Sequence, residues 1–129
     1  MELHHRLVLS VSDLPFAQDG NAGCLLMVSV STADGEPYTG LDKDDFRVHW
    51  VLDAEQDVPL QSLTVDEYQG KGTLPKLPGV YAVQVLTKGG GPWTATSSNV
   101  VTFAIYVKHD HHRGQTLYKV ADPSIAVPR

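Results

Sequence analysis

The chain of 129 residues is poor in cysteine, in long apolar runs and in positive charge. With Cys24 as its only cysteine, it can form no intrachain disulfide and no zinc site built on several thiolates. No apolar run reaches the roughly 18 residues of a membrane-spanning helix. Ten basic residues against fifteen acidic ones give a net charge of −5, which argues against nucleic acid as the main partner.

The surroundings of Cys24 and the first residues bear on the cellular compartment. Cys24 precedes the apolar residues 25–28 without a cationic or histidine neighbour, so we expect a buried small hydrophobe rather than a nucleophile. Residues 7–11 are too short and too alternating for the core of a secretion signal. A reducing cytoplasm fits these features, and an exported protein whose leader has been removed is the alternative.

Alternation of apolar and polar residues with period two is the main pattern in the chain. It predicts strands over 25–32, 46–52, 80–87 and 99–108, and weaker strands over 6–12, 60–67 and 115–120. No stretch of about 12 residues carries the apolar stripe of an amphipathic helix. Residues 53–57 have the best helical composition, but the proline that follows limits them to one turn.

Turn-forming residues separate the predicted strands. Among them, the glycine run 89–91 ahead of Pro92 predicts a loop with no helix after it. The pattern as a whole predicts one domain over 1–121, an antiparallel β-sandwich of seven or eight strands, with an extended C-terminal tail over 122–129. Seven strands are favoured, and a strand over 72–77 would make the eighth.

Two segments carry recognisable motifs. In the first, a strand ends in the turn Asp34-Gly35-Glu36-Pro37, followed by Gly40-Leu41; in the second, a strand opens with Leu77-Pro78-Gly79-Val80-Tyr81. Together they resemble the immunoglobulin-like and prealbumin-like (transthyretin-like, carboxypeptidase-regulatory-like) sandwich modules of many bacterial proteins. The resemblance covers roughly residues 25–108. It implies a positive φ at Gly35, a buried Tyr81 ring whose hydroxyl bonds at a corner, and a role as a binding or spacer module.

The sequence gives little sign of an enzyme or of a cofactor. It contains no Gly-x-Ser-x-Gly elbow, no Walker loop and no His-Glu-x-x-His pair. Sandwich enzymes similar to hydroxyisourate hydrolase close with Tyr-Arg-Gly-Ser, whereas this chain ends in Ala-Val-Pro-Arg. We therefore expect no catalysis.

A histidine cluster near the end of the strongest predicted strand is the alternative functional feature. His109 and His111, two residues apart, would project to one side of an extended backbone, and His112 follows them. With His4 and His5, these residues could hold zinc, copper or nickel if the two groups meet at one end of the sandwich, as seven strands would place them. The simpler interpretation is a solvated polar hairpin.

Two tryptophans differ in context. Trp50 alternates with apolar residues and is predicted to be a core aromatic, whereas Trp93 follows the glycine run. Trp93 either folds back over the end of the sandwich or stands exposed as an anchor for a partner, with Pro92 and Tyr38 as further contact residues.

The resulting hypothesis is a non-catalytic protein-binding or structural accessory module, with no nucleic acid as partner and no membrane span. Its partner would be another protein, contacted through strands or loops, and the oligomeric state stays open. The rivals are the histidine metal site and a carbohydrate-binding sandwich that uses Trp93 and the acidic loops.

Overall fold

The computed structural model describes residues 5–18, 20–51, 54–58, 60–68, 77–96 and 99–122. The elements are β1 (His5–Gln18), β2 (Asn21–Thr32), the 3-10 turn η1 (Lys43–Asp45), β3 (Phe46–Val51), β4 (Glu55–Asp57), β5 (Leu60–Glu67), β6 (Val80–Thr87), the short helix α1 (Gly91–Thr96), β7 (Val100–His109) and β8 (His112–Ala121). The prediction of an all-β fold is confirmed. Within these ranges, no helix is both long enough and apolar enough to cross a bilayer.

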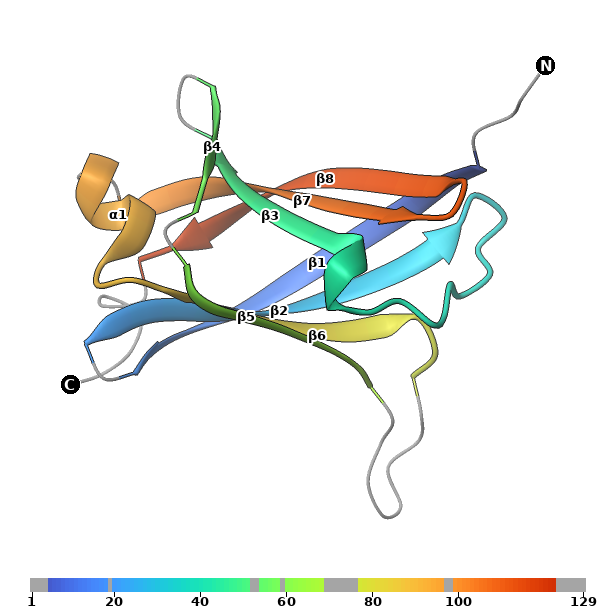
Figure 1. Cartoon of the computed structure of the whole chain (residues 1–129), viewed down its shortest axis with the longest axis horizontal. Coiled ribbons are helices and arrows are strands. Elements are labelled where there is room, and N and C mark those ends of the chain that lie inside the picture. Colours follow the sequence, from blue (N-terminus) through green and yellow to red (C-terminus); the bar gives the residue numbers. More distant parts are fainter. Residues whose placement is uncertain are drawn as a thin grey trace, which may run out of the picture.

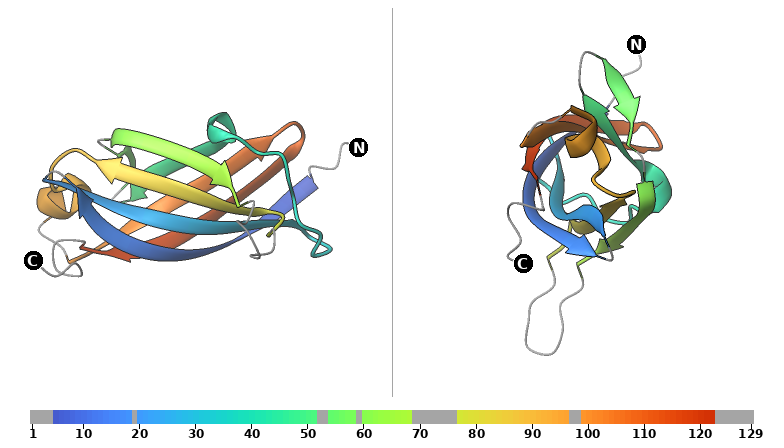
Figure 2. Two further views of the ribbon diagram at one scale, coloured as in Figure 1. Left: turned by 90° about the horizontal axis from the view of Figure 1, so that it is seen from below. Right: turned by 90° about the vertical axis from the view of Figure 1, so that its left-hand side faces the viewer.

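All eight strands belong to one sheet, in the order β4-β3-β7-β8-β1-β2-β6-β5. The sheet curls so that its two halves face each other across the core (Figures 1 and 2). Neighbouring strands are antiparallel except for β1 and β8, which run parallel where His5 and Arg6 meet His112 and Arg113. The sheet is therefore mixed, and this one pair departs from the purely antiparallel arrangement predicted from the sequence.

The seven predicted strands are all present, and an eighth is found where none was expected. Residues 55–57, predicted to form a helical turn at most, form the edge strand β4 and pair with residues 49–51 of β3. The pairing supplies backbone hydrogen bonds to a segment whose side chains are all exposed, so local composition does not decide its structure. The predicted alternative, a strand over 72–77, lies outside the described residues apart from Leu77.

The prediction of a loop with no helix after the glycine run is also wrong in part, because α1 begins at Gly91. Gly91 has φ +57°, and a Cβ there would lie 2.5 Å from the Thr87 hydroxyl oxygen, so this position requires glycine. The Thr87 hydroxyl itself donates a hydrogen bond to the carbonyl oxygen of Ala22 at 2.6 Å. The close approach sets α1 tightly over one end of the sheet (Figure 1).

The core consists of the inward-facing residues of both halves of the sheet. The bulkiest fully buried side chains are Tyr81, Phe46, Phe103, Leu26 and Ile105. Trp50 is buried as predicted, and so is Cys24. Burial, followed by the nearby charge of Asp13, raises the pKa of the Cys24 thiol to about 12. Cys24 is therefore a structural thiol, as expected.

Tyr81 closes the corner between the loop that leads from β2 to β3 and strand β6. Its hydroxyl donates to the carbonyl oxygen of Tyr38 at 2.6 Å and accepts from the backbone N–H of Leu41 at 3.3 Å. Burial raises the pKa of this hydroxyl to about 12, so it stays protonated across the physiological range. The predicted buried ring and corner hydrogen bond are both confirmed, as is the positive φ of Gly35, at +88°.

Candidate binding groove

The histidine hairpin joins β7 to β8 and is fastened to the loop before β3. The hairpin turns at Asp110 and His111, with φ +51° at Asp110. The His109 Nδ1–H donates to Asp45 Oδ1 at 2.9 Å, and the His109 Nε2 lies 3.5 Å from Asp110 Oδ2. The hydroxyl of Tyr38 lies 3.2 Å from His112 Nδ1. These contacts hold the hairpin tip against η1 and the preceding loop.

The contact between His109 and Asp45 shifts the pKa of both groups. The hydrogen bond to Asp45 raises the pKa of His109, although partial burial opposes this. Partial burial raises the pKa of Asp45, but the backbone N–H of Asp42 and the bond from His109 outweigh it, so the net shift is downward. The contact therefore favours the charged form of both groups.

The predicted metal ligands are only partly brought together. His109 ends β7, whereas His111 lies in the turn and His112 begins β8, so the backbone through them is not the extended one expected. The parallel pairing does place His5 opposite His112 in register, so the two histidine groups reach the same end of the sheet. His4 and the side chain of His5 lie outside the described residues. Within the described part of the chain, no group of three or more His, Cys, Asp or Glu residues is arranged to hold a metal.

The predicted partner contacts Trp93 and Pro92 are both buried. The Trp93 side chain is only 2 % exposed, and its indole N–H donates to the carbonyl oxygen of Val120 at 3.1 Å. Its ring meets Phe103 edge to face, with centroids 5.8 Å apart. Trp93 thus folds back over the end of the core, and in this position it cannot act as an exposed anchor. Tyr38 is half-buried within the histidine cluster, with its ring centroid 4.9 Å from that of His112.

A groove of about 830 Å³ lies over strands β1, β8, β7 and β3. Four of the residues that line it are cationic: Arg6, Arg47, Lys108 and Arg113. None of its described lining residues is acidic. We refer to this surface as the basic groove.

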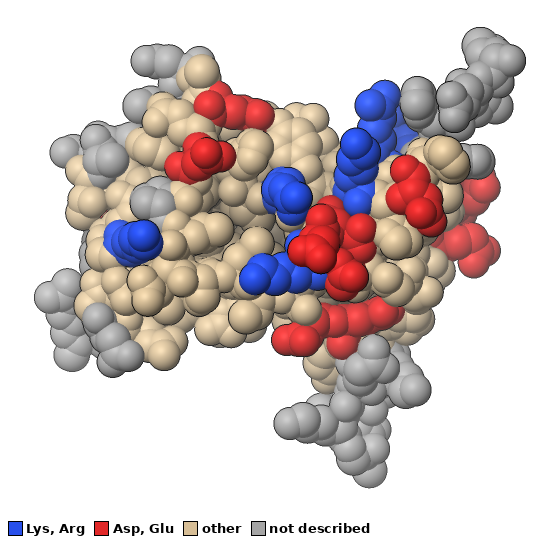
Figure 3. Space-filling model, viewed as in Figure 1, with Lys and Arg blue, Asp and Glu red and all other residues tan. Residues whose placement is uncertain are grey.

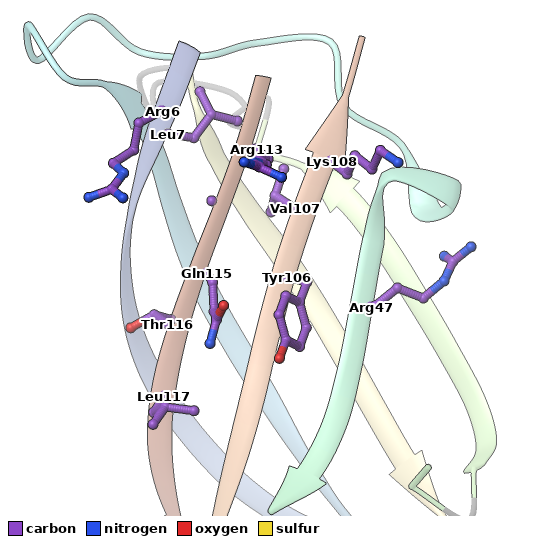
Figure 4. A pocket seen from close by; sticks show the side chains of 11 residues that line it. Arg6, Leu7, Arg47, Tyr106, Val107, Lys108, Arg113, Gln115, Thr116 and Leu117 are labelled. Atoms are coloured by element: carbon purple, nitrogen blue, oxygen red, sulfur yellow. The ribbon is translucent and has the colours of Figure 1, made fainter. Parts of the chain in front are cut away.

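Sheet register brings the four cations together. Arg113 lies opposite Lys108 on β7 and opposite Arg6 on β1, while Arg47 lies opposite Tyr106. Figure 4 shows Lys108 and Arg113 on neighbouring strands, with Arg6 and Arg47 extending from the flanking strands. Like charges directly opposite one another destabilise a sheet. The row formed by Arg6, Arg113 and Lys108 is therefore mutually repulsive.

Within the described ranges, none of the four cations forms an ion pair with a carboxylate. The Arg47 guanidinium instead donates to the backbone carbonyl oxygens of Asp44 and Phe46, at 3.2 and 2.8 Å. Acidic and basic side chains nevertheless gather on the same half of the molecule, near the hairpin (Figure 3). The basic groove is a local positive surface in a chain of net charge −5.

The groove changes character along β8. Leu117, four residues after Arg113 on the same face of the strand, lines the groove and is 58 % exposed. Val8, two residues after Arg6 on β1, is 49 % exposed but is not among the described lining residues. Tyr106 lies between the two ends, where its ring packs against His49 with centroids 5.5 Å apart and its hydroxyl donates to Glu55. The groove therefore has a cationic end near the hairpin and an apolar end further along β8 (Figure 4).

Sequence reasoning missed the basic groove because Arg6 and Arg47 are far in the chain from Lys108 and Arg113, which flank one hairpin. Each of them is an exposed residue in an alternating strand, which by itself indicates only a solvated face. Only the order and register of the strands show that they meet. No protein-family model, curated protein or solved structure matches the chain. Its function is therefore inferred from the geometry of this surface.

Proposed function

We propose that this protein is a non-catalytic protein-binding module that holds an anionic segment of a partner protein in the basic groove. The observation that carries the proposal is a set of four cations, gathered from four strands onto one hollowed face, that form no ion pair with any carboxylate among the described residues. An acidic segment would supply the missing counter-charges.

The chemistry of the lining supports binding rather than catalysis. Among the described lining residues there is no Ser, Cys, His, Asp or Glu, so they offer no serine or cysteine nucleophile and no carboxylate or imidazole base. Tyr106, the one lining residue with an acidic hydroxyl, is engaged with Glu55. The proposal does not depend on a cofactor.

The proposal also includes a relationship of this fold to immunoglobulin-like modules. We infer an immunoglobulin-like sandwich in which the two facing halves of the curled sheet act as the layers. The buried Tyr81 corner and the turn at Gly35 support this inference, since the resemblance implied both features. Modules of this kind commonly act in binding, which agrees with an exposed groove on the outer face of the sheet.

The strength of binding follows from the exposure of the groove. One exposed ion pair contributes about 0.2–1 kcal/mol, so four pairs alone give weak binding. Salt screens exposed charges over about 10 Å at 0.1 M, so the affinity is expected to fall steeply with ionic strength. The cations also speed the encounter with an acidic partner.

Charge reversal tests the proposal. The probe is a fluorescein-labelled peptide of alternating glutamate and serine, and its binding is followed by fluorescence anisotropy at low and high salt. The double variant Lys108→Glu/Arg113→Glu is expected to weaken binding at least about tenfold, equivalent to about 1.4 kcal/mol.

The matched control is Lys88→Glu/Lys119→Glu, which changes the net charge equally at two exposed lysines outside the groove lining. It should weaken binding far less than the groove variant. Equal losses in the two variants, or no binding by the wild type, would refute the proposal.

A further inference from the structure

The two ends of the basic groove differ in what they can bind. The cationic end holds Lys108 and Arg113, whereas the other end is formed by the exposed Leu117. Arg113 and Leu117 are four residues apart on β8 and face the same side of the sheet. At about 3.3 Å per residue, this places them about 13 Å apart along the strand.

We propose that the ligand of the basic groove is an extended segment that combines a cluster of carboxylates with an apolar side chain about four residues away. The carboxylates would contact Lys108 and Arg113, flanked by Arg6, and the apolar side chain would cover Leu117. This inference rests on the proposed function and specifies its ligand.

The spacing follows from the geometry of an extended chain. Residues an even number apart in an extended segment project to the same side. A segment lying along β8 therefore presents a carboxylate and a side chain four residues later to the same surface, with the same separation of about 13 Å as Arg113 and Leu117. An apolar side chain placed an odd number of residues away would point to solvent.

The groove suits a peptide better than a nucleic acid. Single-stranded nucleic acids are bound largely by stacking of bases on exposed aromatic rings. Tyr106, the one aromatic residue among the described lining residues, packs against His49 and bonds to Glu55, so its ring is already engaged. An exposed leucine instead offers a contact for an aliphatic side chain.

The experiment compares three peptides and one oligonucleotide by fluorescence anisotropy. The first peptide carries three glutamates on alternate positions and a leucine four residues after the last. The second has serine in place of that leucine, and the third has the leucine moved by one residue. The oligonucleotide is a ten-nucleotide thymidine strand, and the proteins are the wild type, Leu117→Ser and the control Leu14→Ser. Leu14 is 63 % exposed and does not line the groove.

The wild type is expected to prefer the first peptide over the other two by about fivefold. Leu117→Ser should abolish this preference while its binding of the second peptide stays unchanged, and Leu14→Ser should keep the preference. Because both leucines are exposed, both variants should fold, which circular dichroism verifies.

Each contrary result has a distinct meaning. Equal binding of all three peptides, still sensitive to charge reversal at Lys108 and Arg113, would overturn this inference and leave the proposed function standing. Failure of every peptide to bind would overturn both. Tighter binding of the oligonucleotide than of any peptide would assign the groove to nucleic acid and overturn both as well.

Discussion

Replacing Tyr81 with phenylalanine tests whether the corner hydrogen bonds hold the loop before β3 in place. The ring is fully buried and its hydroxyl bonds two backbone groups, the carbonyl of Tyr38 and the N–H of Leu41. Phenylalanine keeps the packing of the ring and removes only the oxygen. The substitution therefore isolates the two hydrogen bonds from the hydrophobic burial.

The expected loss is about 3 kcal/mol of unfolding free energy. Each hydrogen bond contributes about 1 kcal/mol net, and a buried backbone group left without a partner adds a further penalty of about 1 kcal/mol or more. Leu41 is only 6 % exposed, so water cannot readily replace the hydroxyl at its N–H. In a domain of this size, about 3 kcal/mol lowers the melting temperature by roughly 10 °C.

Urea unfolding followed by fluorescence measures the change, with Tyr106→Phe as the control. The hydroxyl of Tyr106 bonds to the exposed Glu55, so its removal should cost less than about 0.5 kcal/mol. The dependence of the unfolding free energy on urea should be the same in both variants. If Tyr81→Phe proves no less stable than the control, the corner hydrogen bonds do not hold the loop.

Three further predictions concern backbone strain, pH and thiol reactivity. Gly79→Ala should lower the unfolding free energy by at least about 2 kcal/mol, since φ is +79° and a Cβ would lie 2.8 Å from the carbonyl oxygen of Val30. Gly35→Ala, where φ is +88° but no atom is close to the added Cβ, should lower it by about 1 kcal/mol in the same urea assay. The bond to Asp45 raises the pKa of His109, so the stability it adds is complete below the unfolded histidine pKa of about 6.5 and is lost as pH rises through the higher folded value. Asp45→Asn should flatten the curve of stability against pH above about 6.5, and an unchanged curve would contradict this. Cys24, with a pKa of about 12 and no exposure, should react with a disulfide reagent only as fast as the chain opens, whereas immediate reaction without urea would show an accessible thiol.

The strands could be predicted because each of them carries its own alternation of apolar and polar residues. Apart from the buried Ala104, β7 alternates between core residues such as Phe103 and Ile105 and the less buried Tyr106, so no knowledge of its neighbours is needed. The corner at Tyr81 could also be predicted, since the Pro78-Gly79 turn and the tyrosine lie close together in the sequence.

The features that sequence reasoning missed depend on partners distant in the chain. Residues 55–57 become a strand only because β3 lies beside them, and α1 forms where Trp93 finds an acceptor on β8. The basic groove needs the register of β1, β3, β7 and β8 at once. Alternation shows which residues face outward, but it does not show which outward residues become neighbours.

The parallel pairing of β1 with β8 also constrains the order of assembly. His5 and His112 lie more than a hundred residues apart in the chain, so their contact closes a very long loop. During synthesis, β1 can pair with β2 early, but its other side has no neighbour until β8 has left the ribosome. We therefore expect folding to finish late and slowly, with the first strand as the site most prone to aggregation on a nascent chain.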